Sequence, residues 1–291
     1  GAMLSLPMQA ASPSSCMVIL TSSAGVQRHR EHFYAQALNK AGIAALIVDS
    51  FGGRGVRRTV ADQTLVSAAQ MEGDAFAALA WLRSDPRIDP GRIGIMGVSK
   101  GGGASLAAAI AVRQKWRRGF PHLFDLHVAI CPGATAQHRD PTTHGRPIFF
   151  MLAARDDYTP APLAIEYAER MRAAGNRAIK VKVYGGAHHG WESLGPVFDI
   201  KDAENWSCCR NYIEDDRRHF VVAAGRAMPE PEYQAWAREH CVTRGARAGG
   251  GTEDLRRRAT SDLIAFLQDH GFGDAGALVA KQPQAAPIRV D

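Results

Sequence analysis

Hydrophobic and polar positions alternate along the chain in blocks of two kinds. Largely apolar runs of strand length, each closed by small or polar residues, occur at 16–20, 43–48, 92–96, 126–130 and 147–153, and a last strand is predicted at 180–184. Between them lie longer stretches with apolar residues at helical spacing, at 30–41, 67–84, about 100–112 and 161–174. Continuous apolar strands that alternate with helices predict an α/β fold, with a mostly parallel sheet of about six or more strands and helices on both faces.

Residues 195–250 interrupt this alternation. They are polar, they contain one predicted helix near 229–240, and they end in three consecutive glycines. We interpret them as an insertion within a single domain that spans residues 4–291. The domain is counted from residue 4 because the first three residues resemble an expression remnant. A closing helix is predicted over 253–271, and the last twenty residues are predicted to form a loose tail.

Composition narrows the class of protein. The chain has 291 residues, of which 46% are hydrophobic, enough for one large α/β domain. No apolar stretch approaches the roughly 18 residues of a membrane helix. No signal peptide is visible, so we expect a cytoplasmic protein, while a trimmed signal peptide remains an alternative. The net charge is +6, but the arginines are scattered and form no continuous basic stripe, so we expect no nucleic-acid partner.

The five cysteines contain no C-x-x-C pair, and we predict no metal site. Cys16 and Cys131 lie in apolar runs and are predicted to be buried thiols. In an exported protein Cys208 or Cys209 would bridge Cys241, whereas intracellular thiols mostly stay reduced.

Gly97-Val98-Ser99-Lys100-Gly101 is the most informative motif. It lies between a predicted strand and a predicted helix, which is the context of a nucleophile elbow. Glycine on both sides of the serine leaves room that side chains would fill. The following helix N-terminus offers free N–H groups to a developing oxyanion. The motif therefore predicts a nucleophilic serine at Ser99.

A serine hydroxyl needs a base to accept its proton, and the base needs a group that orients it. In doubly wound hydrolases the acid and the histidine follow the serine in that order, on loops after later strands. Asp156 and Asp157 follow the fifth predicted strand, and His188 and His189 follow the sixth. Either aspartate and either histidine fits these roles on this reasoning alone.

Five motifs together resemble the dienelactone hydrolase family of α/β hydrolases, over about residues 16–194 and again at the closing helix. They are 48–55 (VDSFGGRG), 85–94 (DPRIDPGRIG), 97–101 (GVSKG), 156–160 (DDYTP) and 184–191 (YGGAHHGW). The resemblance implies an α/β-hydrolase fold, and this chain is expected to depart from the family's usual fold in having a reduced or absent N-terminal hairpin. It also implies Asp156 as the acid, four residues before the proline, and His189 as the base, directly before a small and an aromatic residue.

The resemblance further implies an oxyanion hole. The Lys100 backbone N–H would be one donor, and the second would come from the loop after the first strand, around Ser22 and Ser23. Many relatives have His-Gly in that loop, where this chain has Thr21-Ser22, so the second donor is the less defined of the two.

Substrate contacts are predicted for Arg54, Tyr158 and Trp191. Arg54 follows a strand in a glycine-rich loop and could hold a substrate carboxylate with its planar fork, the alternative being a surface arginine. The insertion leaves from beside His189, so we expect it to wall the pocket.

These features predict a serine hydrolase that cleaves an ester, lactone or thioester of a small molecule through an acyl-enzyme on Ser99, with no metal or organic cofactor. The substrate could bear a carboxylate, no nucleic-acid or membrane partner is expected, and the oligomeric state is left open. Acyl transfer or peptide hydrolysis on the same residues, and a non-catalytic binding protein, are the alternatives. A dehalogenase is disfavoured because its nucleophile would be a carboxylate.

Overall fold

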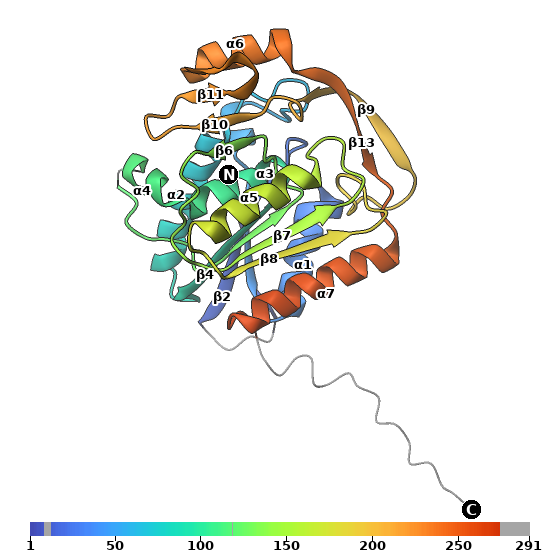
Figure 1. Ribbon diagram of the computed structural model, residues 1–291. Coiled ribbons are helices and arrows are strands. Elements are labelled where there is room, and N and C mark those ends of the chain that lie inside the picture. Colours follow the sequence, from blue (N-terminus) through green and yellow to red (C-terminus); the bar gives the residue numbers. More distant parts are fainter. Residues whose placement is uncertain (9–12, 118, 274–291) are drawn as a thin grey trace, which may run out of the picture.

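A seven-stranded sheet with the order β1-β3-β2-β4-β5-β7-β8 forms the centre of the protein (Figure 1). The computed structural model describes residues 1–8, 13–117 and 119–273. All neighbouring strands are parallel except β1, which pairs antiparallel with β3. The strands are β1 (Ala2–Ser5), β2 (Ser14–Leu20), β3 (Ala44–Val48), β4 (Ile88–Val98), β5 (His127–Ile130), β7 (Ile148–Ala153) and β8 (Ile179–Tyr184). The predicted mostly parallel sheet is confirmed, and each predicted strand matches an observed one to within a few residues.

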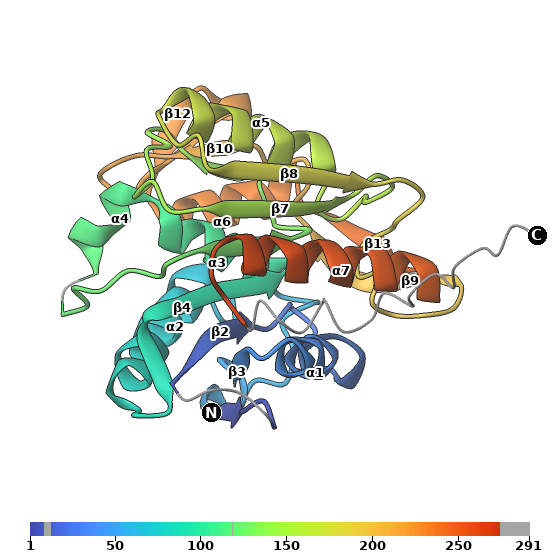
Figure 2. The same ribbon diagram turned by 90° about the horizontal axis from the view of Figure 1, so that it is seen from below.

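Helices cover both faces of the sheet, as the sequence predicts. Figure 2 shows α7 lying across one face, where α1 also packs. The opposite face is covered by α2, α3 and α5. The helices are α1 (Phe33–Lys40), which follows a π-helical turn at Arg28–His32, α2 (Ala68–Ser84), α3 (Lys100–Ala109), the short α4 (Ala111–Trp116), α5 (Ala161–Ala173) and α7 (Glu253–Asp269).

The strand β2 shows why the central strands are apolar throughout. All seven of its residues are buried. Met17 and Ile19 pack in the core beneath α1 and α7, whereas Val18 and Leu20 pack in the core beneath α2 and α3. Successive side chains of a strand point to opposite faces, so a strand covered on both faces needs an apolar residue at every position.

The predicted insertion, together with the short strand β6 (Ala136–His138) from the loop after β5, forms two small sheets and a helix, which lie at the top and right of Figure 1. An antiparallel ribbon is made by β9 (Val197–Asn205) and β13 (Thr243–Gly249). A second sheet has the order β12-β11-β10-β6, and α6 (Glu230–His240) packs beside it. Its strands are β6 (Ala136–His138), β10 (Asn211–Ile213), β11 (His219–Val221) and β12 (Arg226–Met228). Sequence analysis predicted α6 but not these short strands; the division into one domain plus an insertion stays a prediction.

A disulfide joins Cys209 to Cys241, with the two Cα atoms 5.2 Å apart. It connects the segment before β10 to the end of α6. Cys16 and Cys131 are buried free thiols, and Cys208 is exposed. Of the two pairings that the sequence allowed, the structure therefore contains the one through Cys209.

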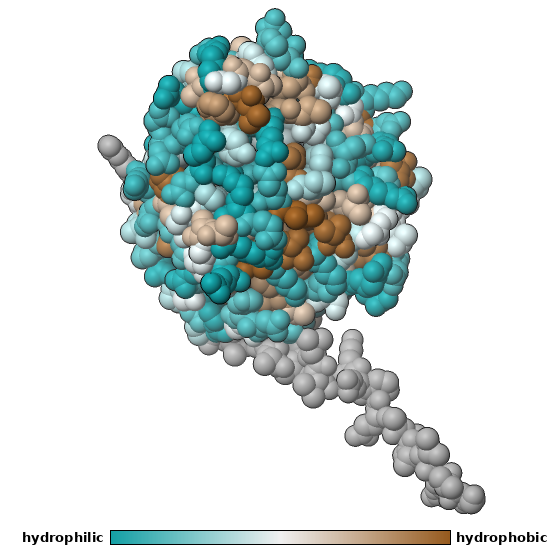
Figure 3. Space-filling view, viewed as in Figure 1, coloured by the Kyte–Doolittle hydropathy of each residue, from teal (hydrophilic) through white to brown (hydrophobic). Residues whose placement is uncertain are grey.

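The surface seen in Figure 3 is mostly hydrophilic, with hydrophobic side chains gathered in a few patches. Within the described ranges, every helix is too short or too polar to cross a membrane. The predicted tail falls, from residue 274 onward, outside the described residues.

Candidate active site

Ser99 lies at the turn between β4 and α3 with backbone angles of φ 58° and ψ −116°. A positive φ is unusual for a residue with a side chain, and here hydrogen bonds hold it in place. The Ser99 N–H donates to Ile130 O (2.8 Å), and the Gly103 N–H donates to Ser99 O (2.9 Å). A Cβ at Gly97 would lie 2.3 Å from the Gly101 carbonyl carbon, and one at Gly101 would lie 2.6 Å from Leu20 O. The two glycines are therefore required for the turn.

Asp156 follows β7 and His189 follows β8, and their side chains meet. His189 Nδ1 lies 2.8 Å from Asp156 Oδ2, and both side chains are buried. The other carboxylate oxygen, Oδ1, accepts the backbone N–H groups of Tyr158 (2.9 Å) and Thr159 (2.8 Å). Burial alone would raise the pKa of Asp156, but the adjacent His189 and these hydrogen bonds together lower it below its ordinary value. The carboxylate is thus an acceptor, which places the imidazole proton on Nδ1 and leaves Nε2 free to act as a base.

The neighbouring Asp157 and His188 have different surroundings. Asp157 forms an ion pair with Arg247 (2.8 Å) and is partly exposed. No hydrogen bond joins His188 to an aspartate within the described part of the chain. The Ser99 hydroxyl and His189 are also not hydrogen-bonded to each other in these residues, and such a contact commonly tightens only when substrate is bound.

Thr159 joins the aspartate and the histidine, and sequence reasoning missed it. Its Oγ1 lies 2.9 Å from Asp156 Oδ2, 2.9 Å from Cys131 O and 3.0 Å from His189 Nδ1. The hydroxyl has one proton to donate, to Cys131 O or to the carboxylate, so its lone pairs are left to accept from His189 Nδ1–H. The residue also lines the cavity above Ser99. Thr159 is thus placed to hold the imidazole in one orientation.

Thr159→Val is expected to lower kcat for ester hydrolysis about tenfold, the effect of losing one hydrogen bond to a charged group. Thr159→Ser keeps the hydroxyl and is expected to stay within about threefold of the wild type. Steady-state kinetics together with thermal unfolding of both variants would check this. Equal losses in the serine and valine variants would show that the methyl group, and not the hydroxyl, is what matters.

Cys131, Asp156 and His189 are the described group whose ligand atoms lie close enough together to hold a metal ion, within 4.8 Å of one another. Two of these ligand atoms, His189 Nδ1 and Asp156 Oδ2, are already hydrogen-bonded to each other. Burial raises the pKa of the Cys131 thiol well above its ordinary range, so it is not a thiolate, the form that binds metals. We assign no metal to this group.

The loop after β2 corrects one predicted role. The Ser22 N–H donates to Glu31 Oε1 (3.3 Å), so it is not free to stabilise an oxyanion. Ser22 Oγ accepts a hydrogen bond from the buried Arg30 (2.6 Å), and this contact helps to hold the loop in place. The backbone N–H groups of Ser23 and Lys100 have no partner among the described residues, and both residues line the same cavity as Ser99.

Two predicted substrate contacts are also wrong. The turn after β3 directs Arg54 toward α2, where it binds both carboxylate oxygens of Asp74 (2.7 and 2.9 Å), and it lines a separate cavity. Trp191 is fully buried in the core beneath α7, against Tyr184. Tyr158 does line the cavity at Ser99, and its hydroxyl accepts from Gln63 Nε2 (2.7 Å).

The cavity above Ser99 has a volume of about 260 Å³. One side is formed by the sheet domain, through Ser23, Lys100, Gly133 and Thr159. The opposite side comes from the predicted insertion, through Glu204, Trp206, His219, Glu230, Tyr233 and Gln234. The segment that leaves from beside His189 therefore does wall the pocket.

The chain has the architecture of an α/β hydrolase, since the serine turn, the aspartate and the histidine all lie where the parallel strands end. It belongs to the dienelactone hydrolase family, whose family model matches residues 1–205, and it is a carboxylic ester hydrolase.

Solved structures with the same fold have low sequence identity. Esterase 2 of Thermogutta terrifontis, phosphoramylated by tabun, is 15% identical with a TM-score of 0.59, over 94% of this chain and 90% of that one. A putative dienelactone hydrolase from Klebsiella pneumoniae is 18% identical with a TM-score of 0.53, over 65% of this chain and 81% of that one. At these identities the likeness shows the fold alone. No curated protein matches the sequence.

Proposed function

We propose that the protein hydrolyses an ester, lactone or thioester of a small molecule through an acyl-enzyme on Ser99. The observation that carries this proposal is the buried 2.8 Å contact between His189 and Asp156, joined by Thr159 to the cavity that Ser99 lines. Nucleophilic catalysis requires a base held in one tautomer and a serine that a substrate can reach, and Ser99 lines the same cavity as Thr159.

In the first half of the reaction, His189 Nε2 accepts the Ser99 proton as Oγ attacks the substrate carbonyl. The negative charge that develops on the carbonyl oxygen is stabilised by the N–H groups of Ser23 and Lys100. The tetrahedral intermediate collapses, and the leaving alcohol or thiol takes the proton from His189. Asp156 stays ionised and stabilises the imidazolium while it exists.

In the second half, His189 accepts a proton from water, and the resulting hydroxide attacks the acyl group on Ser99. Collapse of the second intermediate returns the proton to Ser99 Oγ and releases the acid. The net reaction is one ester plus one water to one acid plus one alcohol, and it needs no cofactor.

The test is labelling by a fluorophosphonate probe, which phosphonylates activated serine hydroxyls. The Thermogutta esterase offers a parallel, because it is described as phosphoramylated by tabun. We expect stoichiometric labelling of Ser99, located by peptide mass mapping, together with hydrolysis of p-nitrophenyl acetate and butyrate. A folded protein that neither takes up the probe nor hydrolyses any ester would support the binding-protein alternative instead.

A further inference from the structure

Among the residues that the structure describes, none offers a free cation to a substrate in the cavity above Ser99. Lys100 lines it, but the three N–H groups of its ammonium donate to Thr59 Oγ1 (3.0 Å), Gln63 O (2.7 Å) and Val66 O (2.7 Å). Burial also lowers the pKa of Lys100 to about 7, so its charge is partial at neutral pH. No arginine lines this cavity in the described part of the chain.

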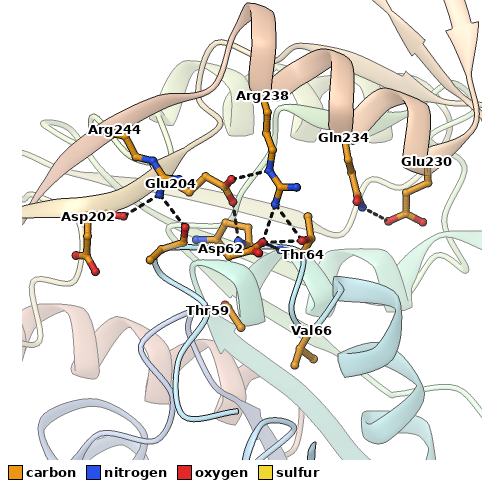
Figure 4. Close-up of polar contacts among 12 residues, drawn as sticks. Thr59, Asp62, Thr64, Val66, Asp202, Glu204, Glu230, Gln234, Arg238 and Arg244 are labelled. Carbon is orange, nitrogen blue, oxygen red and sulfur yellow. Dashed lines mark hydrogen bonds and ion pairs between the residues drawn. The ribbon is translucent and has the colours of Figure 1, made fainter. Parts of the chain in front are cut away.

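Arg238 of α6 does not line the cavity, and its side chain reaches from the helix to Glu204, Asp62 and Thr64 (Figure 4). Its Nε donates to Glu204 (3.0 Å), and its Nη2 donates to Asp62 (2.7 Å) and Thr64 (3.0 Å). Both carboxylate oxygens of Glu204 have a hydrogen-bond partner, because the second one accepts the Gln63 N–H (2.7 Å). These contacts tie the insertion to the loop before α2. One guanidinium faces two carboxylates, so Arg238 has no charge to spare for an anionic substrate.

Glu230, in the first turn of α6, is a charged residue of the cavity lining that has no ion-pair partner among the described residues. It lines the cavity and is exposed, so it lies at the mouth. One carboxylate oxygen accepts from Gln234 Nε2 (3.1 Å), and the other has no protein partner among the described residues (Figure 4). Glu230 therefore presents an incompletely paired carboxylate at the edge of the cavity.

The wall behind Glu230 is aromatic. His219 stacks on Tyr233 with ring centres 4.5 Å apart, and Trp206 packs against the same tyrosine. Burial lowers the pKa of His219 to about 4, so its ring is uncharged at neutral pH. The faces of aromatic rings attract cations and repel anions.

We infer that the substrate group bound in this cavity carries no negative charge, and that Glu230 makes esters with a cationic group the better substrates. The inference rests on the proposed function, because it concerns the same cavity. It replaces the carboxylate-bearing substrate that Arg54 suggested, since Arg54 is bound to Asp74 elsewhere.

The test uses three p-nitrophenyl esters of one shape. The 4-(trimethylammonio)butanoyl ester is cationic, the 5,5-dimethylhexanoyl ester is neutral, and the 4-sulfobutanoyl ester is anionic. We expect kcat/KM to fall in that order, with about tenfold or more between the cationic and anionic esters, as for one partly screened charge pair. The inference would be overturned if the anionic 4-sulfobutanoyl ester were cleaved as well as the neutral ester.

Glu230→Gln is expected to shrink the ratio of cationic to anionic kcat/KM by about threefold or more. The matched control is Glu239→Gln, which makes the same change of charge on the same helix at a side chain that is 79% exposed and outside the cavity. The control should keep the wild-type ratio. Equal ratios in the wild type and Glu230→Gln would show that Glu230 does not set the preference. Failure of all three esters together with failure of the fluorophosphonate probe would instead refute the proposed function.

Discussion

Ser99→Ala is expected to lower kcat for p-nitrophenyl butyrate by about 10⁶-fold, the loss measured when a triad nucleophile is removed from another serine hydrolase. The reason is chemical, because alanine has no atom that can form the acyl-enzyme. His189 and Asp156 would remain in place, but they would have no nucleophile to activate. The steady-state rate of p-nitrophenolate release by the two proteins measures the effect.

The fold should survive this substitution. The Ser99 hydroxyl has no hydrogen-bond partner among the described residues, and alanine at this position meets the same backbone constraint as serine. Thermal unfolding of Ser99→Ala should therefore stay close to that of the wild type. Ser84→Ala, at the end of α2 and outside the cavity, is the matched control and should keep full activity. A Ser99→Ala protein that keeps more than about one part in a thousand of its kcat would overturn the assignment of the nucleophile.

The inner strands β2, β3, β5 and β7 could be predicted because they are buried on both faces, which makes each one a largely apolar run. The edge strand β1 gives no such signal, since it has four residues and two of them are exposed. The ribbon strand β9 gives no such signal either, since five of its nine residues are exposed and polar residues interrupt the apolar ones. Strands that are held mainly by pairing with a neighbouring strand, and not by burial, lack the apolar run by which a strand is predicted from sequence.

The order of serine, aspartate and histidine could be predicted because parallel strands bring their carboxyl ends to one edge of the sheet. The errors concern residues whose role depends on a distant partner. Arg54 is held by Asp74, and the Ser22 amide is held by Glu31, and neither contact follows from local sequence. Thr159 was missed because a threonine in a loop carries no chemical signature of its own.

Asp156→Asn is expected to lower kcat by about 10⁴-fold, because the geometry forces the wrong imidazole tautomer. The position of Oδ1 receives two backbone N–H groups, so the amide oxygen of asparagine must occupy it. The amide NH₂ then faces His189 Nδ1 and donates to it. The imidazole proton moves to Nε2, which can no longer accept the proton of Ser99.

Asp157→Asn is the matched control, since it changes the same charge at the adjacent residue and removes only a surface ion pair with Arg247. It is expected to stay within about twofold of the wild-type kcat. A second readout is stability against pH. Because the pKa of Asp156 is lowered in the folded protein, its charge stabilises the fold above the ordinary pKa of aspartate, and this contribution is lost as the pH falls toward the lowered value. Asp156→Asn should therefore lose less stability than the wild type on acidification. If Asp157→Asn showed the large loss of kcat and Asp156→Asn did not, the acid would be Asp157, and the 2.8 Å contact with His189 would be structural.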